Sequence, residues 1–356
     1  MNCQMILVIS SPSISTTVPV TLILLMGAEF SSRILFAGAS RIRYERTAKS
    51  PAPPTAPLPR SGQGSALRSG AADQALEATL STGPTHAVMG LACWGAVSLV
   101  ASAHGIAVDE HTWIAGAALT SGAALLPDLD HPPATVSRSF GPVTKGLSHV
   151  VEKLSLLIYN VIRLPKDPKR HGGHRTFTHT VVFAALAGIV TTSLMLLHLW
   201  WVTALLLFFF TGLGVRGLLH EWDHHADTFV VIAASLALSW ESWSWLHTGG
   251  GHAQWAGVAV ATGCLAHCLG DAITEEGCPF LWPVPLGLKL WRPLGLPTFL
   301  RYRTGGKVEM MFVGPLCTVL SVWLALVALQ QAHIFGWLDG VPLFPHVNLH
   351  LEHQAG

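Results

Sequence analysis

The sequence predicts an all-α fold, a polytopic bundle of helices that crosses a membrane. Half of the 356 residues are hydrophobic, only 12% are charged, and the mean hydropathy is +0.46. Soluble globular domains carry roughly twice this share of charged residues, about 25%. Trp occurs 13 times against three Tyr, which fits aromatic residues placed at membrane interfaces. We expect an integral membrane protein, in contact with lipid and without a stable nucleic-acid partner.

Apolar segments recur along the chain from residue 87 onward, separated by polar connections. Such runs are typical of membrane helices, because backbone in lipid must satisfy its own hydrogen bonds. Several are shorter than the roughly 20 residues of a perpendicular span, so we expect some to be tilted or packed inside the bundle. The predicted helices cover residues 87–103, 113–126, 181–201, 202–219, 229–240, 255–269 and 311–329.

The first 82 residues form an N-terminal extension. Residues 1–36 are moderately apolar but carry no basic residue before the apolar stretch, which argues against a signal peptide. They are either one additional membrane segment or an extension upstream of the true start. Residues 41–82 are rich in Pro, Ala, Arg, Ser and Gly and predict a disordered linker. A membrane domain at 83–331 and a tail at 332–356 follow.

Basic residues predict the orientation in the membrane. Lys and Arg fall in three blocks, 33–68, 138–175 and 289–307, with Arg216 as the exception. If these blocks face the cytoplasm, His and Asp recur at the cytoplasmic ends of five successive helices. Ionisable residues at membrane helices are candidates for function.

The first candidate motif is Pro127-Asp128-Leu129-Asp130-His131-Pro132, directly after an apolar run. The prolines on both sides prevent a continuous helix from including the two carboxylates and the imidazole. Hard oxygens with a borderline nitrogen suit zinc, with manganese or iron as alternatives. An ordinary solvated loop is the competing interpretation.

The second motif is Gly172-Gly173-His174-Arg175-Thr176-Phe177-Thr178-His179. At about 100° per residue the two histidines would diverge on one helix, so His174 is placed in the glycine loop and His179 in the first turn. Thr178 is then the expected helix cap. Arg175 is a candidate clamp for an anionic substrate or, alternatively, a positive anchor at the cytoplasmic surface.

The third motif pairs His267 with Asp271 four residues later, on one helical face. The carboxylate could bind metal or hold the imidazole in place. Thr274, Glu275 and Glu276 follow as candidates for proton transfer.

A rival motif is His220-Glu221-Trp222-Asp223-His224, which matches the His-Glu-x-x-His pattern of zinc proteases. It supports the alternative of an intramembrane zinc metalloprotease. A third alternative is a membrane protein without enzymatic activity.

Together these motifs resemble the YdjM-type family of inner-membrane-associated metal-dependent hydrolases, over roughly Gly83 to Pro285. The resemblance implies a location in the inner (plasma) membrane, a metal site, and a distant similarity to zinc-dependent phospholipase C and P1-type nucleases. It hence implies hydrolysis of a phosphoester, with a phospholipid as one candidate. With the orientation predicted from the basic blocks, the metal site would lie at the cytoplasmic helix ends. The segment between His179 and His267 is longer than in the family pattern. The implied metal-site residues are His86, Asp128, Asp130, His131, His174, His179, His267 and Asp271.

The expected function is therefore a membrane-bound, zinc-dependent hydrolase that activates water for attack on a phosphoester. Asp128, Asp130 and Glu275 all remain candidates for the base, and Arg175 is the candidate for binding substrate.

Overall fold

A computed structural model describes residues 83–106, 108–218, 232–240, 243 and 253–331. The predicted N-terminal extension, the pattern at 220–224 and the C-terminal tail lie outside these residues. Within them the chain is helical, and its β structure consists of isolated bridges such as Thr274 to Tyr302. The all-α prediction is confirmed for this part of the chain.

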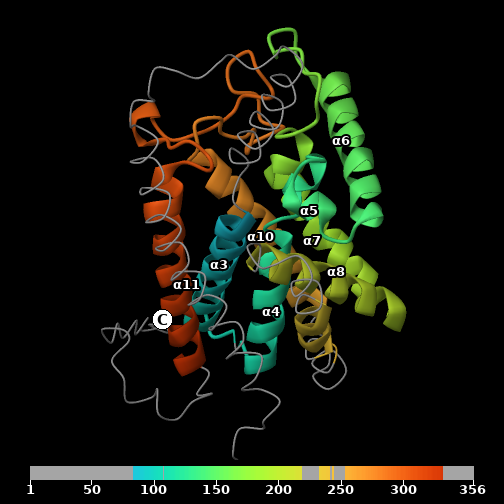
Figure 1. Cartoon of the computed structure of the whole chain (residues 1–356), viewed down its shortest axis with the longest axis vertical. Coiled ribbons are helices and arrows are strands. Elements are labelled where there is room, and N and C mark those ends of the chain that lie inside the picture. The colour runs from blue at the N-terminus through green and yellow to red at the C-terminus, as the bar shows by residue number, and fades with distance from the viewer. Residues whose placement is uncertain (1–82, 107, 219–231, 241–242, 244–252, 332–356) are drawn as a thin grey trace, which may run out of the picture.

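Among the described residues, six helices pack together as a bundle, with α10 in contact with three of the others, while a seventh long helix, α6 (Pro142–Ile162), lies at its edge (Figure 1). Helix α10 packs against α7, α4 and α3, while α11 covers α3 and α8 lies along α4. Residues 232–240 add a further helical segment. The six helices are α3 (Gly83–Ala103), α4 (Glu110–Ala123), α7 (Val181–Leu196), α8 (Trp200–Leu218), α10 (Ala253–Ala272) and α11 (Gly314–Gln331).

Within the described residues, three segments are long and apolar enough to cross a membrane: Gly83–Ala103, Trp200–Leu218 and Glu309–Ala328. The shorter helix α7 is also apolar. The sequence predicted membrane helices over these three segments and over α7. Length and composition confirm the prediction for the three segments. The start of the last segment is the π-helix η4 (Glu309–Val313).

Small residues bring the helix backbones together. A Cβ atom at Gly188 of α7 would lie only 2.6 Å from the carbonyl oxygen of Gly257 in α10. Between α4 and α10, the Thr120 hydroxyl donates to the Ala259 carbonyl at 3.0 Å. Close approach at small residues, with hydroxyl groups bonding across the contact, is the usual packing of membrane helices.

The turn before α7 differs from the prediction. Thr178 does not cap the helix, because the chain first makes the 3-10 turn η2 (Phe177–His179). Thr180 is the cap, and its hydroxyl accepts a hydrogen bond from the Phe183 N–H at 3.1 Å. His179 therefore precedes α7 instead of lying in its first turn.

The basic segment 138–170 is largely helical, although it lies between the predicted helices 113–126 and 181–201. Helix α6 (Pro142–Ile162) begins after Gly141, whose φ of +60° suits glycine, with Pro142 at the favoured first position. It packs against the two short turns η1 (Pro127–Asp130) and η2. The single-turn helix α5 (Thr135–Arg138) precedes it, and the turn η3 (Thr298–Leu300) lies in the later loop.

Candidate metal centre

The ligand-type residues meet where four helices end or begin. His86 lies in the first turn of α3, and Asp128 lies in η1, which follows α4. His179 ends η2 just before α7, and His267 and Asp271 lie in the last turns of α10. The expected convergence of helix ends therefore holds for these four, while the fifth, at His220, is outside the described residues.

Four side-chain atoms converge at the middle of this cluster: His179 Nε2, His267 Nε2, Asp128 Oδ1 and Asp271 Oδ2. The two ring nitrogens are 3.2 Å apart. His179 Nε2 lies 3.7 Å from the Asp128 oxygen and 3.3 Å from the Asp271 oxygen. For His267 Nε2 the two distances are 3.5 and 3.6 Å. Ligands about 2.0–2.1 Å from a tetrahedral zinc ion stand roughly 3.3 Å apart, so these five separations fit one small cation.

The opposite nitrogen of each ring is tied to a group behind it. His267 Nδ1 lies 2.8 Å from the Ala124 carbonyl oxygen, at the C-terminus of α4. His179 Nδ1 lies 3.0 Å from the Thr178 hydroxyl and 3.5 Å from Asp130 Oδ2. Histidines that bind metal typically donate their second N–H in this way, which leaves Nε2 as the ligand. Two Nε2 lone pairs this close require a positive charge between them, either a proton or a cation.

Asp130 is occupied by two neighbours and faces away from the central point. Its Oδ1 lies 2.8 Å from His174 Nδ1, and its Oδ2 accepts a short hydrogen bond from Thr178. Burial alone would raise the pKa of the Asp130 carboxyl, but the adjacent His179 and His174 outweigh this effect and hold the pKa at about 2. Asp130 is thus an anion that orients both histidines.

Arg175 holds the second central carboxylate. Its Nη2 donates to Asp271 Oδ1 at 2.9 Å, and its Nη1 donates to the Thr274 hydroxyl at 3.2 Å and to the Gly277 carbonyl at 3.4 Å. The other oxygen, Asp271 Oδ2, is buried and has no hydrogen-bond donor among the described residues. A buried carboxylate oxygen without a donor is costly unless a cation binds it.

The backbone at Arg175 is unusual, with φ at +54° in the left-handed region. This conformation is unfavourable for a residue with a Cβ atom and is found where the surrounding structure enforces it, often at functional sites. Arg170 supports the same turn, because its Nη1 donates to the His174 carbonyl at 2.9 Å.

His86 adds a ring on the remaining side. It stacks on His267 with ring centroids 4.0 Å apart, and its Nε2 lies 3.8 Å from Asp271 Oδ1. Its Nδ1 is buried without a described hydrogen-bond partner. Three overlapping groups of ligand atoms result: His86, Asp128 and His267; Asp128, His174 and His179; His179, His267 and Asp271.

The charge balance of the cluster favours a cation. Burial disfavours a proton on His179, yet Asp130, Asp128 and Asp271 surround the ring and raise its pKa well above the usual range. Burial also opposes the charge on Asp128, but His267 and His179 lower its pKa overall. The carboxylates are therefore ionised, and a divalent metal could supply the positive charge that they attract.

The cluster is most exposed at His174 and Asp128. The His174 side chain is 31% exposed and that of Asp128 12%, whereas those of His86, His179, His267 and Asp271 are 5% exposed or less. Asp128 is thus the one central carboxylate that water can reach.

Asp130, predicted as a metal ligand, belongs to none of the three groups, because His174 and Thr178 occupy its two oxygens. Two further predicted site residues stay outside the convergence. His131 belongs to none of the three groups, because the chain leaves η1 in an extended conformation there and its ring stacks on His174 at 4.3 Å. Glu275 is exposed, and its described hydrogen bonds are those of its backbone, to Tyr302 and Arg301. Sequence reasoning missed the Ala124 carbonyl, the role of Thr178 and that of Arg170.

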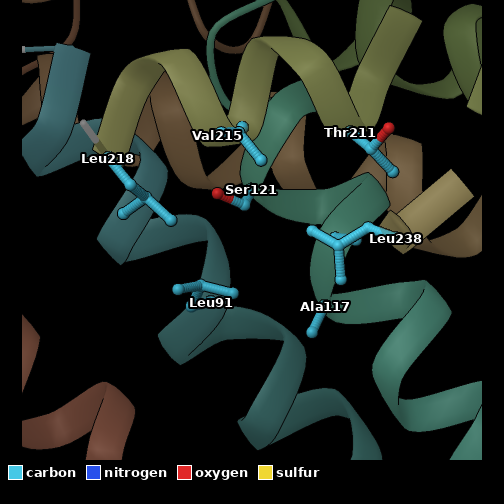
Figure 2. Close-up of a pocket in the computed structure, with 9 residues that line it drawn as sticks. Leu91, Ala117, Ser121, Thr211, Val215, Leu218 and Leu238 are labelled. Atoms are coloured by element: carbon cyan, nitrogen blue, oxygen red, sulfur yellow. The ribbon is translucent and has the colours of Figure 1, made fainter. Parts of the chain in front are cut away.

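The cavity shown in Figure 2 is a different feature, between α3, α4, α8 and residue Leu238. Its volume is about 20 Å³, and its lining is largely apolar, with Ser121 and Thr211 as the polar side chains. That is room for about one water molecule. The cluster of His and Asp is therefore the candidate site.

Residues 81–222 match the model of the YdjM inner membrane protein family. The resemblance that the motifs suggested is confirmed over this range, which includes His86, Asp128, Asp130, His174 and His179. His267 and Asp271 lie beyond the matched range and join the cluster through α10. No curated protein and no solved structure matches the chain.

Proposed function

We propose that this protein is a membrane-bound metal-dependent hydrolase with zinc, or else manganese or iron, held by His179, His267, Asp128 and Asp271. The observation that carries the proposal is the convergence of these four atoms, with each imidazole fixed from behind at Nδ1. His86 and His174 complete the set and leave room for a second ion. When bound, the metal would lower the pKa of a water molecule and stabilise charge on an oxygen of the substrate.

Asp128 is the residue that we assign as the base. It is the central carboxylate with access to water, whereas Asp130 and Asp271 are occupied by Thr178 and Arg175. Oδ1 is the atom assigned to the metal, so the other oxygen of Asp128 would accept the proton that water loses when it attacks the substrate. The sequence left three candidates for the base, and we choose Asp128 among them. Glu275 is exposed and lies outside the cluster.

Arg175 takes a different part from the substrate clamp that the sequence suggested. Its guanidinium is 8% exposed and is engaged by Asp271, so we assign it to positioning that ligand. The ion pair with Glu276, at 3.3 Å, joins it to a side chain that is 75% exposed and adds little.

A phosphoester remains the substrate class that we favour, with a phospholipid as one member. Its support is now the basic turn beside the accessible ligand His174, where Arg170 contacts the His174 carbonyl and Lys166 and Lys169 are exposed. Arg and Lys attract phosphate oxygens. The similarity to phospholipase C and P1 nuclease and the cytoplasmic orientation of the site stay predictions.

The test is hydrolysis of bis(p-nitrophenyl) phosphate by the purified full-length chain, before and after chelation and with zinc or manganese restored. We expect activity that disappears with the metal and is lost in Asp128→Asn, while His104→Ala retains it. Stoichiometric metal without phosphoesterase activity would reject the reaction class and keep the metal site. If Glu221→Gln abolished hydrolysis of a peptide while Asp128→Asn did not, the protease alternative would replace our proposal.

A further inference from the structure

Helix α6 buries polar side chains and exposes apolar ones, which is the reverse of a surface helix on a water-soluble protein. The side chains that it buries against the molecule are small or polar: Thr144, Ser148, Ser155 and Tyr159. Five of its large apolar side chains are more than half exposed: Val143 75%, Val150 62%, Leu154 51%, Leu157 58% and Val161 74%.

These outward residues form one continuous stripe along the helix. They recur every three or four positions, and Leu147, 41% exposed, lies on the same face. Figure 1 shows α6 along the outer edge of the molecule, so one side of the helix faces away from the bundle. Contiguous exposed apolar surface of this kind marks a site of contact with lipid or protein.

Charged and polar residues border the stripe on one side. Lys145, His149, Lys153 and Asn160 are all exposed, and helical geometry places them next to the apolar face. The segment 138–170 contains seven Lys or Arg residues against two Asp or Glu. One of the two acids, Asp167, is buried and accepts hydrogen bonds from the backbone of Leu164, Leu290 and Trp291.

The end of α6 also packs against a second exposed apolar region. The Tyr159 ring lies 5.1 Å from the Trp291 ring, between centroids, so the loop that follows Cys278 packs against the end of α6. That loop exposes Leu288 at 63% and Phe299 at 82%.

We infer that the outward face of α6 is a lipid-binding surface, inserted among the acyl chains of a bilayer with anionic headgroups. An apolar stripe with a basic border is the pattern of helices that bind such membranes. The charge decides between lipid and a second copy of this chain, because two segments of the same positive charge would repel each other. This helix is not among the three candidate spans, so the inference adds a membrane contact that hydropathy alone does not reveal.

The inference is independent of the proposed hydrolysis, but it has a consequence for the cluster. The inner face of α6 contacts η1 and η2, which carry Asp128, Asp130 and His179. A Cβ atom at Gly173 would overlap the Glu152 backbone, so the chain just before His174 lies directly on α6. A helix anchored in lipid would therefore hold the accessible side of the metal cluster near the membrane surface.

The test uses the full-length chain in vesicles of phosphatidylglycerol and phosphatidylethanolamine. A benzophenone amino acid replaces Val150 or Leu157 on the apolar face, or Lys153 on the charged border as the matched control. After irradiation, intact-mass measurement and gel electrophoresis identify what each position has captured. We expect lipid adducts at positions 150 and 157, at several times the yield found at 153.

Three results would overturn the inference: dimers captured at 150 and 157, crosslinks within the same chain, or equal lipid labelling at 150, 157 and 153. Each result names the occupant of the face directly. Metal content of the same samples is read separately, so a failure of this inference does not count against the metal site.

Discussion

The two ends of the same helices carry histidines of opposite character. His86 and His179 lie at the starts of α3 and α7, buried to 4% and 0% exposure and surrounded by carboxylates. His104 and His198 follow the ends of these two helices and are exposed. The His104 ring merely contacts the Val100 carbonyl of its own helix, at 3.0 Å from Nδ1.

This difference shows that abundance of histidine is a poor indicator of a metal site. What distinguishes the cluster end is burial beside carboxylates, together with the Nε2 atoms of His179 and His267, which converge on one point while each Nδ1 is held from behind. An exposed histidine at a helix end pays no desolvation cost and needs no function. Substitutions at the two ends test this contrast.

The largest effect is expected for His267→Ala, which removes a central ligand. Loss of an outer partner typically weakens metal binding about 10–100-fold, so loss of the ligand should cost at least as much as the upper figure. Zinc titration against a competing chelator measures it. His104→Ala is the control and should bind zinc like the wild type; equal loss in both variants would refute the contrast.

Arg175→Met should come next, because it leaves the buried Asp271 and Thr274 without their donor. Breaking one partner from a buried ion pair costs about 3–5 kcal/mol, and we expect a loss of that order in unfolding free energy in detergent. Lys166→Met, at an exposed position, should change stability by less than about 0.5 kcal/mol. An Arg175→Met protein as stable as Lys166→Met would show that the pair with Asp271 is unimportant.

Thr178→Val tests the link between Asp130 and His179 with little change in shape. Removing the hydroxyl leaves both groups short of a partner, and metal affinity should fall about tenfold, the lower figure for an outer residue. The same exchange at Thr192, whose hydroxyl contacts the Ala253 carbonyl at 3.4 Å far along α7, should leave affinity unchanged. A reversed ranking of the two variants would remove Thr178 from the account.

The smallest effect is predicted for Gly270→Ala. A Cβ atom there would stand 3.0 Å from the His86 ring and 3.1 Å from Met89 Sδ, so the ring must shift slightly. We expect zinc affinity to fall less than about tenfold, because His86 is peripheral to the four central atoms. Gly146→Ala in α6 meets nothing within 4 Å and should leave the metal unaffected.

The local sequence predicted much of this site. Prolines around Asp128 and Asp130 end α4, the spacing of His267 and Asp271 places them on one face of α10, and membrane topology brings the helix ends together. Partners distant in sequence could not be predicted in the same way. Arg175 and Asp271 are 96 positions apart, and the Ala124 carbonyl has no side chain to identify it.

Other differences have local causes. The 3-10 turn before α7 moves the cap from Thr178 to Thr180, which frees Thr178 to join Asp130 and His179. Helix α6 was not among the predicted helices, although its apolar repeat is present in the sequence. Its reversed orientation follows from the polar residues that it buries and from its contact with η1 and η2, which only the structure shows.

The most direct test of the central claim is zinc-edge X-ray absorption on the purified full-length protein. We predict bound zinc with only nitrogen and oxygen neighbours at about 2.0–2.1 Å, including imidazole, and loss of this signal in Asp128→Asn. A sulfur neighbour at about 2.3 Å, or full zinc occupancy in Asp128→Asn, would contradict the site of His179, His267, Asp128 and Asp271.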